Sequence, residues 1–469
     1  MRRSLLTLGL GGAAALVALL VPDLQAALSP SPVTAPTPAA PTPVDASPQP
    51  TGPSGSLIFS ARLDQGTLLA GSDEDRFLVI TVAAPEAEAG RRMPVDVAVV
   101  MDTSGSMSGW HKIDYARLAA RELVGSLQPG DRFSLVTFSD RARVLLPSQE
   151  IGDAREILAT IDRIQEGGGT NMYGGITTGL EQLRTGDPSF VRRLLLLSDG
   201  HANVGISDAG SLANLTRQAS VADVSTSTIG LGLDFNEDML AAMADAGGGS
   251  YHFVDQAPQL ADIFGVELDA MTHTVARDVT VRMDLPPGVS VVDTYGYTDT
   301  QDAGGWRVYL GDITAGQERK IVVRIDHPAA VEGTLQLADV TLDYQDLDLD
   351  LDIHRGIALD APITRNAARA QASLDHETAI KATRAQAAAL ADQAARAFEN
   401  NDRTKATASL VQTSNILRRA SEQLAAPELL DDELDYMVVM PAYQTAEPSS
   451  DEGLRAVKSQ KEVSRGYAL

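Results

Sequence analysis

Three short polar segments in the middle of the chain carry side chains of the types that bind a hard metal ion. Residues 102–106 (Asp-Thr-Ser-Gly-Ser) and 199–200 (Asp-Gly) each follow an apolar run, and residues 167–171 (Gly-Gly-Gly-Thr-Asn) are glycine-rich. Together they offer two carboxylates and three hydroxyls, a donor set that suits octahedral Mg²⁺ or Mn²⁺. Neutral hydroxyls leave a bound cation electrophilic, so such a site should keep a position open for an anionic oxygen from outside. The candidate metal ligands are Asp102, Ser104, Ser106, Thr170 and Asp199.

The elements that must position these side chains alternate between short apolar runs and helix-length segments. The expected strands are residues 95–101, 132–138, 142–146, 192–198, 225–231 and 250–254. The expected helices are residues 113–127, 154–164, 172–184, 212–219, 236–246 and 259–271. Residues 97–100 and 194–197 lack polar alternation, which is typical of central strands covered on both faces. The pattern predicts an α/β fold with a doubly wound, mostly parallel sheet, whose strand ends bring the three polar segments to one edge.

The motif resembles the metal-ion-dependent adhesion site of von Willebrand factor type A domains. The D-x-S-x-S of residues 102–106, then Thr170, then Asp199 match it in type and order, and the resemblance covers residues 94–273. It implies that Ser104, Ser106 and Thr170 bind the ion directly. It implies further that Asp102 and Asp199 act mostly through water, and that a Glu or Asp of a partner protein completes the coordination.

Two other interpretations apply to the same residues. Asp and Ser after a strand often cap the next helix, and three glycines often mark an ordinary loop. A Mg²⁺-dependent phosphoesterase is the enzymatic alternative, but phosphatases of the haloacid dehalogenase type need a second Asp two positions after the first, where this chain has Ser104. We expect His111, Lys112 and His201, which lie near the motif, to be surface residues. The chain is therefore not expected to be an enzyme.

The composition narrows the classes of partner. Of 469 residues, 63 are acidic and 38 basic, and the resulting net charge of −25 repels phosphate backbones, so no nucleic-acid binding is expected. Cysteine is absent, which excludes thiol catalysis, disulfides and cysteine-ligated zinc. The seven histidines form no HExxH pattern, which argues against a zinc hydrolase.

The N-terminus predicts the compartment. Arg2 and Arg3 precede an apolar run over residues 5–21 and then Ala26 and Ala27, the order of a secretory signal. We expect residues 1–27 to be a signal peptide or, if uncleaved, a membrane anchor. Residues 28–55 contain nine prolines and predict a semi-rigid linker. The protein is expected to be exported to the periplasm, the cell surface or the medium, with any membrane tether at the N-terminus only.

The segments around the α/β domain predict further parts. Alternating strands over residues 56–93 and 274–360 indicate one β-sandwich into which the α/β domain (94–273) is inserted. Residues 346–353 alternate Asp with Leu or Ile, which predicts a strand with an aspartate row that either binds calcium or, as we favour, is a solvated face.

The C-terminal part is alanine-rich. Residues 361–426 predict a helical hairpin with Asp402 as an N-cap, more suited to internal packing than to binding a partner. Residues 427–469 are expected to be an acidic and polar tail, mostly disordered from residue 441.

These patterns favour an exported protein-binding module for adhesion or complex assembly. Its Mg²⁺-loaded (or Mn²⁺-loaded) site would capture a partner's carboxylate. A constitutive structural subunit of an envelope complex would use the same metal site for a permanent partner. The sequence does not identify the partner.

Overall fold

The computed structural model describes residues 55–468 except 73, 88–91, 185, 186, 188, 303 and 304. The expected signal segment and nearly all of the proline-rich linker lie outside the described residues. Within the described part of the chain, no helix is both long and apolar enough to span a membrane.

The α/β domain is built on a six-stranded sheet in the order β6-β5-β4-β7-β8-β9. Neighbouring strands are parallel except β5 and β6, which pair antiparallel. This confirms the predicted doubly wound, mostly parallel sheet. The strands are β4 (Val95–Asp102), β5 (Arg132–Phe138), β6 (Ala142–Glu150), β7 (Val191–Ser198), β8 (Val224–Leu231) and β9 (Gly248–Val254).

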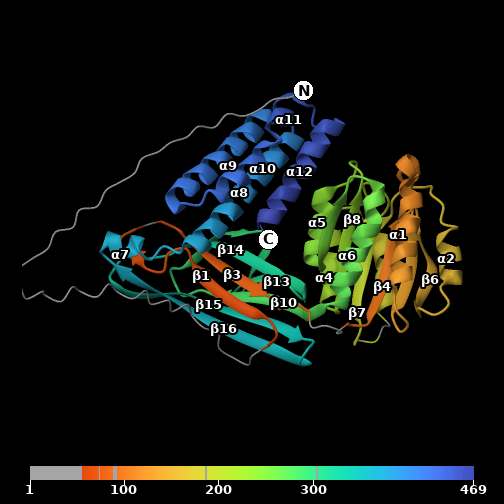
Figure 1. The fold of residues 1–469 in the computed structure, drawn as a ribbon, viewed down its shortest axis with the longest axis horizontal. Helices are drawn as coiled ribbons and strands as arrows, with labels where there is room; N and C mark the ends of the chain where they lie inside the picture. Colours follow the sequence, from red (N-terminus) through yellow and green to blue (C-terminus); the bar gives the residue numbers. More distant parts are fainter. Residues whose placement is uncertain are drawn as a thin grey trace, which may run out of the picture. The chain divides into compact units, whose positions relative to one another are not determined.

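Helices cover both faces of this sheet (Figure 1). Along β4, Val97 and Val99 pack into one apolar core while Ala98 and Val100 pack into the other, because successive side chains of a strand point to opposite faces. The first face carries α1 (Lys112–Ser126), α2 (Arg155–Ile161) and α6 (Leu260–Thr272). The second face carries α3 (Met172–Leu183), α4 (Ala209–Ser220) and α5 (Glu237–Ala246).

Strands from before and after the α/β domain form two further sheets that share one apolar core. β3 and β14 pair antiparallel, so the α/β domain is inserted between strands of the same sheet. The first sheet runs β1 (Ile58–Leu63), β3 (Arg76–Ala83), β14 (Glu318–Asp326) and β11 (Ser290–Tyr295). The second runs β12 (Asp299–Asp302), β13 (Gly305–Thr314), β10 (Thr274–Asp284), β15 (Gly333–Asp346), β16 (Leu351–Thr364) and β2 (Leu68–Leu69).

The single strand expected over residues 346–353 is wrong, because residues 347–350 form a turn between two strands. β15 ends at Asp346 and β16 begins at Leu351. The buried Asp346 carboxylate reverses the chain, because its Oδ1 accepts hydrogen bonds from the backbone N of Asp348 and Leu349 at 2.9 and 3.0 Å. An Asp side chain that binds nearby backbone amides in this way favours a turn over a strand. The aspartates therefore do not form one row on a strand, although Asp348, Asp350 and Asp352 are exposed.

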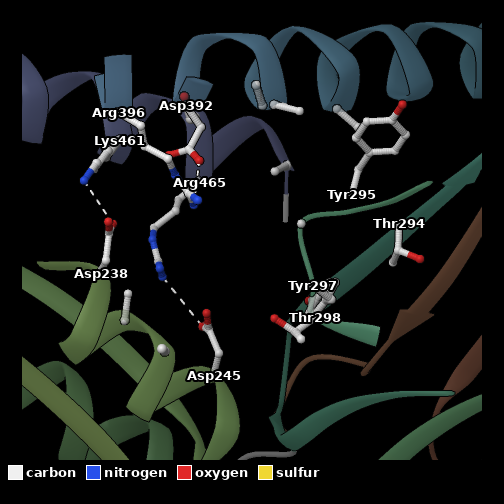
Figure 2. Close-up of a pocket in the computed structure, with 18 of the residues that line it drawn as sticks. Asp238, Asp245, Thr294, Tyr295, Tyr297, Thr298, Asp392, Arg396, Lys461 and Arg465 are labelled. Carbon is white, nitrogen blue, oxygen red and sulfur yellow. Dashed lines mark hydrogen bonds and ion pairs between the residues drawn. The ribbon is translucent and has the colours of Figure 1, made fainter. Parts of the chain in front are cut away.

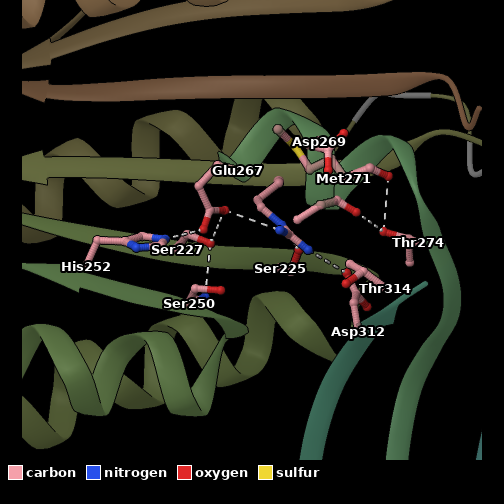
Figure 3. A network of polar contacts seen from close by, with 12 residues as sticks. Ser225, Ser227, Ser250, His252, Glu267, Asp269, Met271, Thr274, Asp312 and Thr314 are labelled. Atoms are coloured by element: carbon pink, nitrogen blue, oxygen red, sulfur yellow. Dashed lines mark hydrogen bonds and ion pairs between the residues drawn. The ribbon is translucent and has the colours of Figure 1, made fainter. Parts of the chain in front are cut away.

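A buried ionic network joins the α/β domain to the sandwich (Figure 3). Arg193 on β7 contacts Glu267 on α6 at 3.2 Å and Asp312 on β13 at 3.4 Å. Glu267 also accepts one hydrogen bond from Ser227 Oγ at 2.7 Å and pairs with His252 at 2.6 Å. Burial alone would raise the pKa of Glu267, but the His252 and Arg193 contacts outweigh it and lower that pKa to about 2. The network therefore keeps a charged Glu267 buried between α6 and the sheet.

The described chain after β16 consists of helices joined by short connections, so the disordered tail expected from residue 441 is wrong. Its helices are α7 (Ala367–Gln371), α8 (His376–Glu399), α9 (Arg403–Leu424), α10 (Glu428–Met437), α11 (Met440–Thr445) and α12 (Asp451–Ala468). The α8–α9 hairpin has Asp402 as the N-cap of α9, as expected. α12 buries Ala456 and Val457 in the same core as Phe398 and Tyr443. The sequence of α12 is mostly polar, so its few buried apolar residues did not predict a packed helix.

A row of basic side chains on α12 contacts the α/β domain (Figure 2). Lys461 donates to Asp238 on α5 at 2.9 Å, and Arg465 lies 3.7 Å from Asp245 of the same helix. These pairs line a cleft of about 390 Å³. Lys458 lies 3.5 Å from the centre of the Phe235 ring. The basic residues that appeared to belong to a solvated tail thus fix α12 to α5.

Candidate metal centre

The three predicted polar segments meet at the carboxyl end of the central strands. β4 and β7 are adjacent and parallel, so Asp102 at the end of β4 and Asp199 immediately after β7 emerge side by side. The glycine-rich segment joins them before α3. The structure therefore brings Asp102, Asp199 and Thr170 to the same sheet edge, as the strand order required.

Backbone hydrogen bonds fasten the three loops to one another. Gly167 N donates to Thr103 O at 2.7 Å, and Gly105 N donates to Gly168 O at 3.1 Å. Thr170 N donates to the Oδ1 of Asn203 at 2.8 Å, which ties the glycine-rich loop to the segment after β7. Asn203 was not predicted as a site residue, because a single Asn in a loop belongs to no recognisable pattern.

Asp102 is completely buried and held by two hydrogen bonds. Its Oδ1 accepts from Ser104 N at 2.8 Å and its Oδ2 from Ser198 Oγ at 2.6 Å. Burial raises the pKa of Asp102 to about 6, the hydrogen bonds from Ser198 and Ser104 offset part of that rise, and the Asp199 carboxylate adds to it. A bound cation would remove this electrostatic cost. Ser198, which was expected only as the last residue of a strand, thus also orients the Asp102 carboxylate.

The three hydroxyls converge on the space beside Asp199. Ser104 Oγ lies 3.0 Å from Ser106 Oγ, and Ser106 Oγ donates to Asp199 Oδ1 at 2.7 Å. These hydroxyls hydrogen-bond to each other and to Asp199, and their neutral oxygens are of the type that would bind a hard cation such as Mg²⁺ or Mn²⁺. A Cβ added to Gly200 would lie 3.4 Å from Ser106 Oγ and 4.0 Å from Thr170 Oγ1. Glycine at this position leaves the space between the hydroxyls open.

The donor set is open to solvent on one side. Ser106 is exposed, whereas Asp102, Ser104, Thr170 and Asp199 are buried. Across the described residues, no group of three or more His, Asp or Glu side chains is placed to hold a metal ion. The site offers two carboxylates with hydroxyls, a set that fits a hard divalent cation with one face accessible to an outside oxygen.

Lys112, expected as a surface residue, is part of the site. Its Nζ donates to Asp199 Oδ2 at 2.6 Å, and only 14% of its side chain is exposed. The expectation was wrong because the turn before α1 directs this side chain inward, which the order of residues does not reveal. His111 and His201 are exposed, as expected.

Comparison with known proteins identifies the domain that carries these residues. The family model of the von Willebrand factor type A domain matches residues 96–266, which include all five candidate ligands. The chain contains a von Willebrand factor type A (VWA) domain. VWA domains are often metal-dependent protein-interaction modules.

Several relatives share more than one third of the chain. An uncharacterized protein of Synechocystis is 26% identical over 301 residues, which are 62% of this chain and 70% of the relative. The uncharacterized protein YfbK of Escherichia coli is 28% identical over 52% of this chain and 44% of its own length. Inter-alpha-trypsin inhibitor heavy chain H4 of Homo sapiens is 29% identical over 45% of this chain. This last alignment spans only 24% of the human protein, and that of YfbK less than half of the relative.

Two solved structures share the fold beyond the VWA domain. The von Willebrand factor type A protein from Catenulispora acidiphila superposes with a TM-score of 0.68 at 19% identity and covers 88% of this chain and 97% of its own. The ArnB paralog VWA2 from Sulfolobus acidocaldarius gives a TM-score of 0.59 at 18% identity, covering 88% and 99%. At these identities the likeness shows the fold alone.

Proposed function

We propose that this protein is a binding module whose VWA domain holds Mg²⁺ or Mn²⁺ and captures a carboxylate of a partner protein. The observation that carries the proposal is the convergence of three hydroxyls and two carboxylates at the end of β4 and β7, with Ser106 exposed at its rim. Ser104, Ser106 and Thr170 would hold the ion, with Asp102 and Asp199 behind them. When bound, the ion supplies a coordination position for an anionic oxygen.

Hydrolysis of phosphate esters is less well supported by the same site. Lys112 is engaged by Asp199 at 2.6 Å, and His111 lies 3.1 Å from Asp114 on the exposed start of α1. His201 faces Asp234 at 4.0 Å. The two histidines thus pair with exposed carboxylates outside the hydroxyl cluster, and the Lys112 ammonium is already paired with Asp199. Turnover of p-nitrophenyl phosphate that is lost in Asp102→Asn would reverse this ranking.

We further propose that the protein acts outside the cytoplasm, as a transient adhesion module or as a constant subunit of an envelope complex. The support is the signal-like sequence of residues 1–27. Fractionation of cells that produce the full chain, with N-terminal sequencing of the mature protein, tests the export. Recovery of an uncleaved chain in the cytoplasm would refute it.

The decisive experiment compares two buried aspartates of the same strand. Cross-linked complexes are isolated from native cells with the wild type, Asp102→Ala and Asp96→Ala, in Mg²⁺ and in EDTA. Asp96 lies at the other end of β4, where it pairs with Arg132 at 3.5 Å. We expect partners that are retained in Mg²⁺ by the wild type and Asp96→Ala but lost in EDTA and in Asp102→Ala. Equal retention by Asp102→Ala would refute the proposed function.

A further inference from the structure

The Lys112 ammonium holds an unusual position for a residue at a cation site. Asp199 has both oxygens occupied: Ser106 Oγ donates to Oδ1 at 2.7 Å, and Lys112 Nζ donates to Oδ2 at 2.6 Å. The Asp199 side chain is fully buried. One oxygen therefore faces the hydroxyl cluster while the other is neutralised by a fixed cation.

The surrounding backbone is arranged around this lysine. Gly232, at the end of β8, has a φ of 85°, and a Cβ placed on it would lie 3.4 Å from both Cε and Nζ of Lys112. The two residues before Lys112, Trp110 and His111, have φ values of 54° and 57°, in the left-handed region that large side chains avoid. These strained residues set the turn that directs Lys112 towards Asp199.

Local helix electrostatics do not account for a lysine here. Lys112 is the first residue of α1, where the partial positive charge of the helix N-terminus disfavours a cation. The stabilising partner of Lys112 is thus Asp199. Lys112 therefore acts on the site through its positive charge.

The charge balance gives that role. Asp102 and Asp199 contribute two negative charges and Lys112 one positive charge, so the cluster without metal carries a net charge of −1 rather than −2. After a divalent cation binds, the same cluster carries +1 rather than 0. A fixed positive charge repels an incoming cation and attracts an incoming carboxylate.

We propose that Lys112 is a specificity-determining residue that lowers the affinity of the site for its metal ion and raises the affinity of the loaded site for a carboxylate ligand. This inference rests on the proposed function. Lys112 acts through Asp199 and through the field at the open position, so it is a positioning and electrostatic residue. A merely structural residue would affect metal and carboxylate binding in the same direction, whereas Lys112 affects them in opposite directions.

The test measures both affinities in the full chain with defined probes. Mn²⁺ binding is followed by the electron paramagnetic resonance signal of the free ion. Acetate binding to the Mn²⁺-loaded protein is followed by ¹³C relaxation. The variants are Lys112→Gln, which keeps an N–H donor for Asp199 without the charge, and Lys112→Met, which removes both. Lys405→Met is the control. It lies on the exposed start of α9 and changes the net charge of the chain by the same amount as Lys112→Met.

We expect Lys112→Gln and Lys112→Met to bind Mn²⁺ at least about tenfold more tightly and acetate at least about fivefold more weakly, with Lys405→Met unchanged. If both affinities fall, or neither changes, while the wild type binds both probes, the inference fails and the proposed function stands. If the wild type itself binds no Mn²⁺, the proposed function fails and the inference with it. Lys112→Gln keeps the test valid if Lys112→Met does not fold.

Discussion

Replacing Asp102 with Asn should stabilise the metal-free protein and abolish its response to Mg²⁺. Burial raises the pKa of Asp102 from 3.8 to about 6, so the folded protein favours the protonated carboxyl. The contribution of this protonated carboxyl to the free energy of unfolding is fully present below pH 3.8 and is lost as the pH rises through 6. At pH 8 the buried carboxylate is charged and destabilises the fold. At about 1.4 kcal/mol per pH unit, the rise corresponds to at most about 3 kcal/mol.

Asn removes this charge at little structural cost. Its oxygen can accept from Ser104 N, and its amide can donate to Ser198 Oγ in place of the bond that Asp102 accepts at 2.6 Å. Allowing about 1 kcal/mol for the altered hydrogen bond, we expect a gain of about 2 kcal/mol at pH 8 in EDTA. In a domain of this size that gain raises the melting temperature by about 4–8 °C.

The assay is thermal unfolding in EDTA and in Mg²⁺, at pH 8 and pH 5. The wild type should gain about 2.7 kcal/mol at a Mg²⁺ concentration 100-fold above its Kd, and Asp102→Asn should gain nothing. Asp96→Asn is the matched control, because Asp96 is equally buried on β4 and burial also raises its pKa, but it should keep the Mg²⁺ gain. An Asp102→Asn protein that is less stable than the wild type at both pH values would refute the reasoning, as would one that keeps the Mg²⁺ gain.

Three further outcomes follow from the same structure. Protons compete with the cation at Asp102, so calorimetry should give a Mg²⁺ Kd about tenfold weaker at pH 5 than at pH 8, and a flat profile would contradict the raised pKa. Lys458→Met breaks the buried contact with Glu237 and should lower the free energy of unfolding, measured with urea, by about 2–4 kcal/mol. The control Arg455→Ala, at a residue that is 56% exposed in the wild type, should change that free energy by less than about 0.5 kcal/mol. Equal effects of the two variants would contradict the docking of α12. Trp110 is 89% exposed, so Trp110→Ser should leave the melting temperature unchanged but weaken retention of the partner, and unchanged retention would contradict a contact between Trp110 and the partner.

Apolar pattern and motif order predicted the α/β domain because both are local signals. The uninterrupted apolar residues of β4 and β7 could only belong to central strands, and parallel strands place their carboxyl ends together. Residues 102–106, Thr170 and Asp199 therefore had to meet at one edge. The side chains that orient them, Ser198 and Asn203, were missed because neither belongs to a repeated or spaced pattern.

The expectations that failed depended on partners distant in the chain. Residues 346–353 have strand periodicity, yet the Asp346 carboxylate binds the amides that follow it and the chain turns. α12 is too polar to predict a packed helix by itself. Lys461 is buried because two carboxylates face it, that of Asp238, more than 200 residues earlier, and that of Glu399.

The sequence by itself determined the central sheet, the edge at which the polar loops meet and the oxygen chemistry of the candidate ligands, since these follow from periodicity and residue type. Only the tertiary structure decided the electrostatics of the site. Whether Lys112 faces solvent or neutralises Asp199 depends on the backbone turn at Trp110 and on the space beside Gly232, and neither is encoded in a local pattern. Charges act through space, so their effect on binding depends on positions that only the folded chain defines.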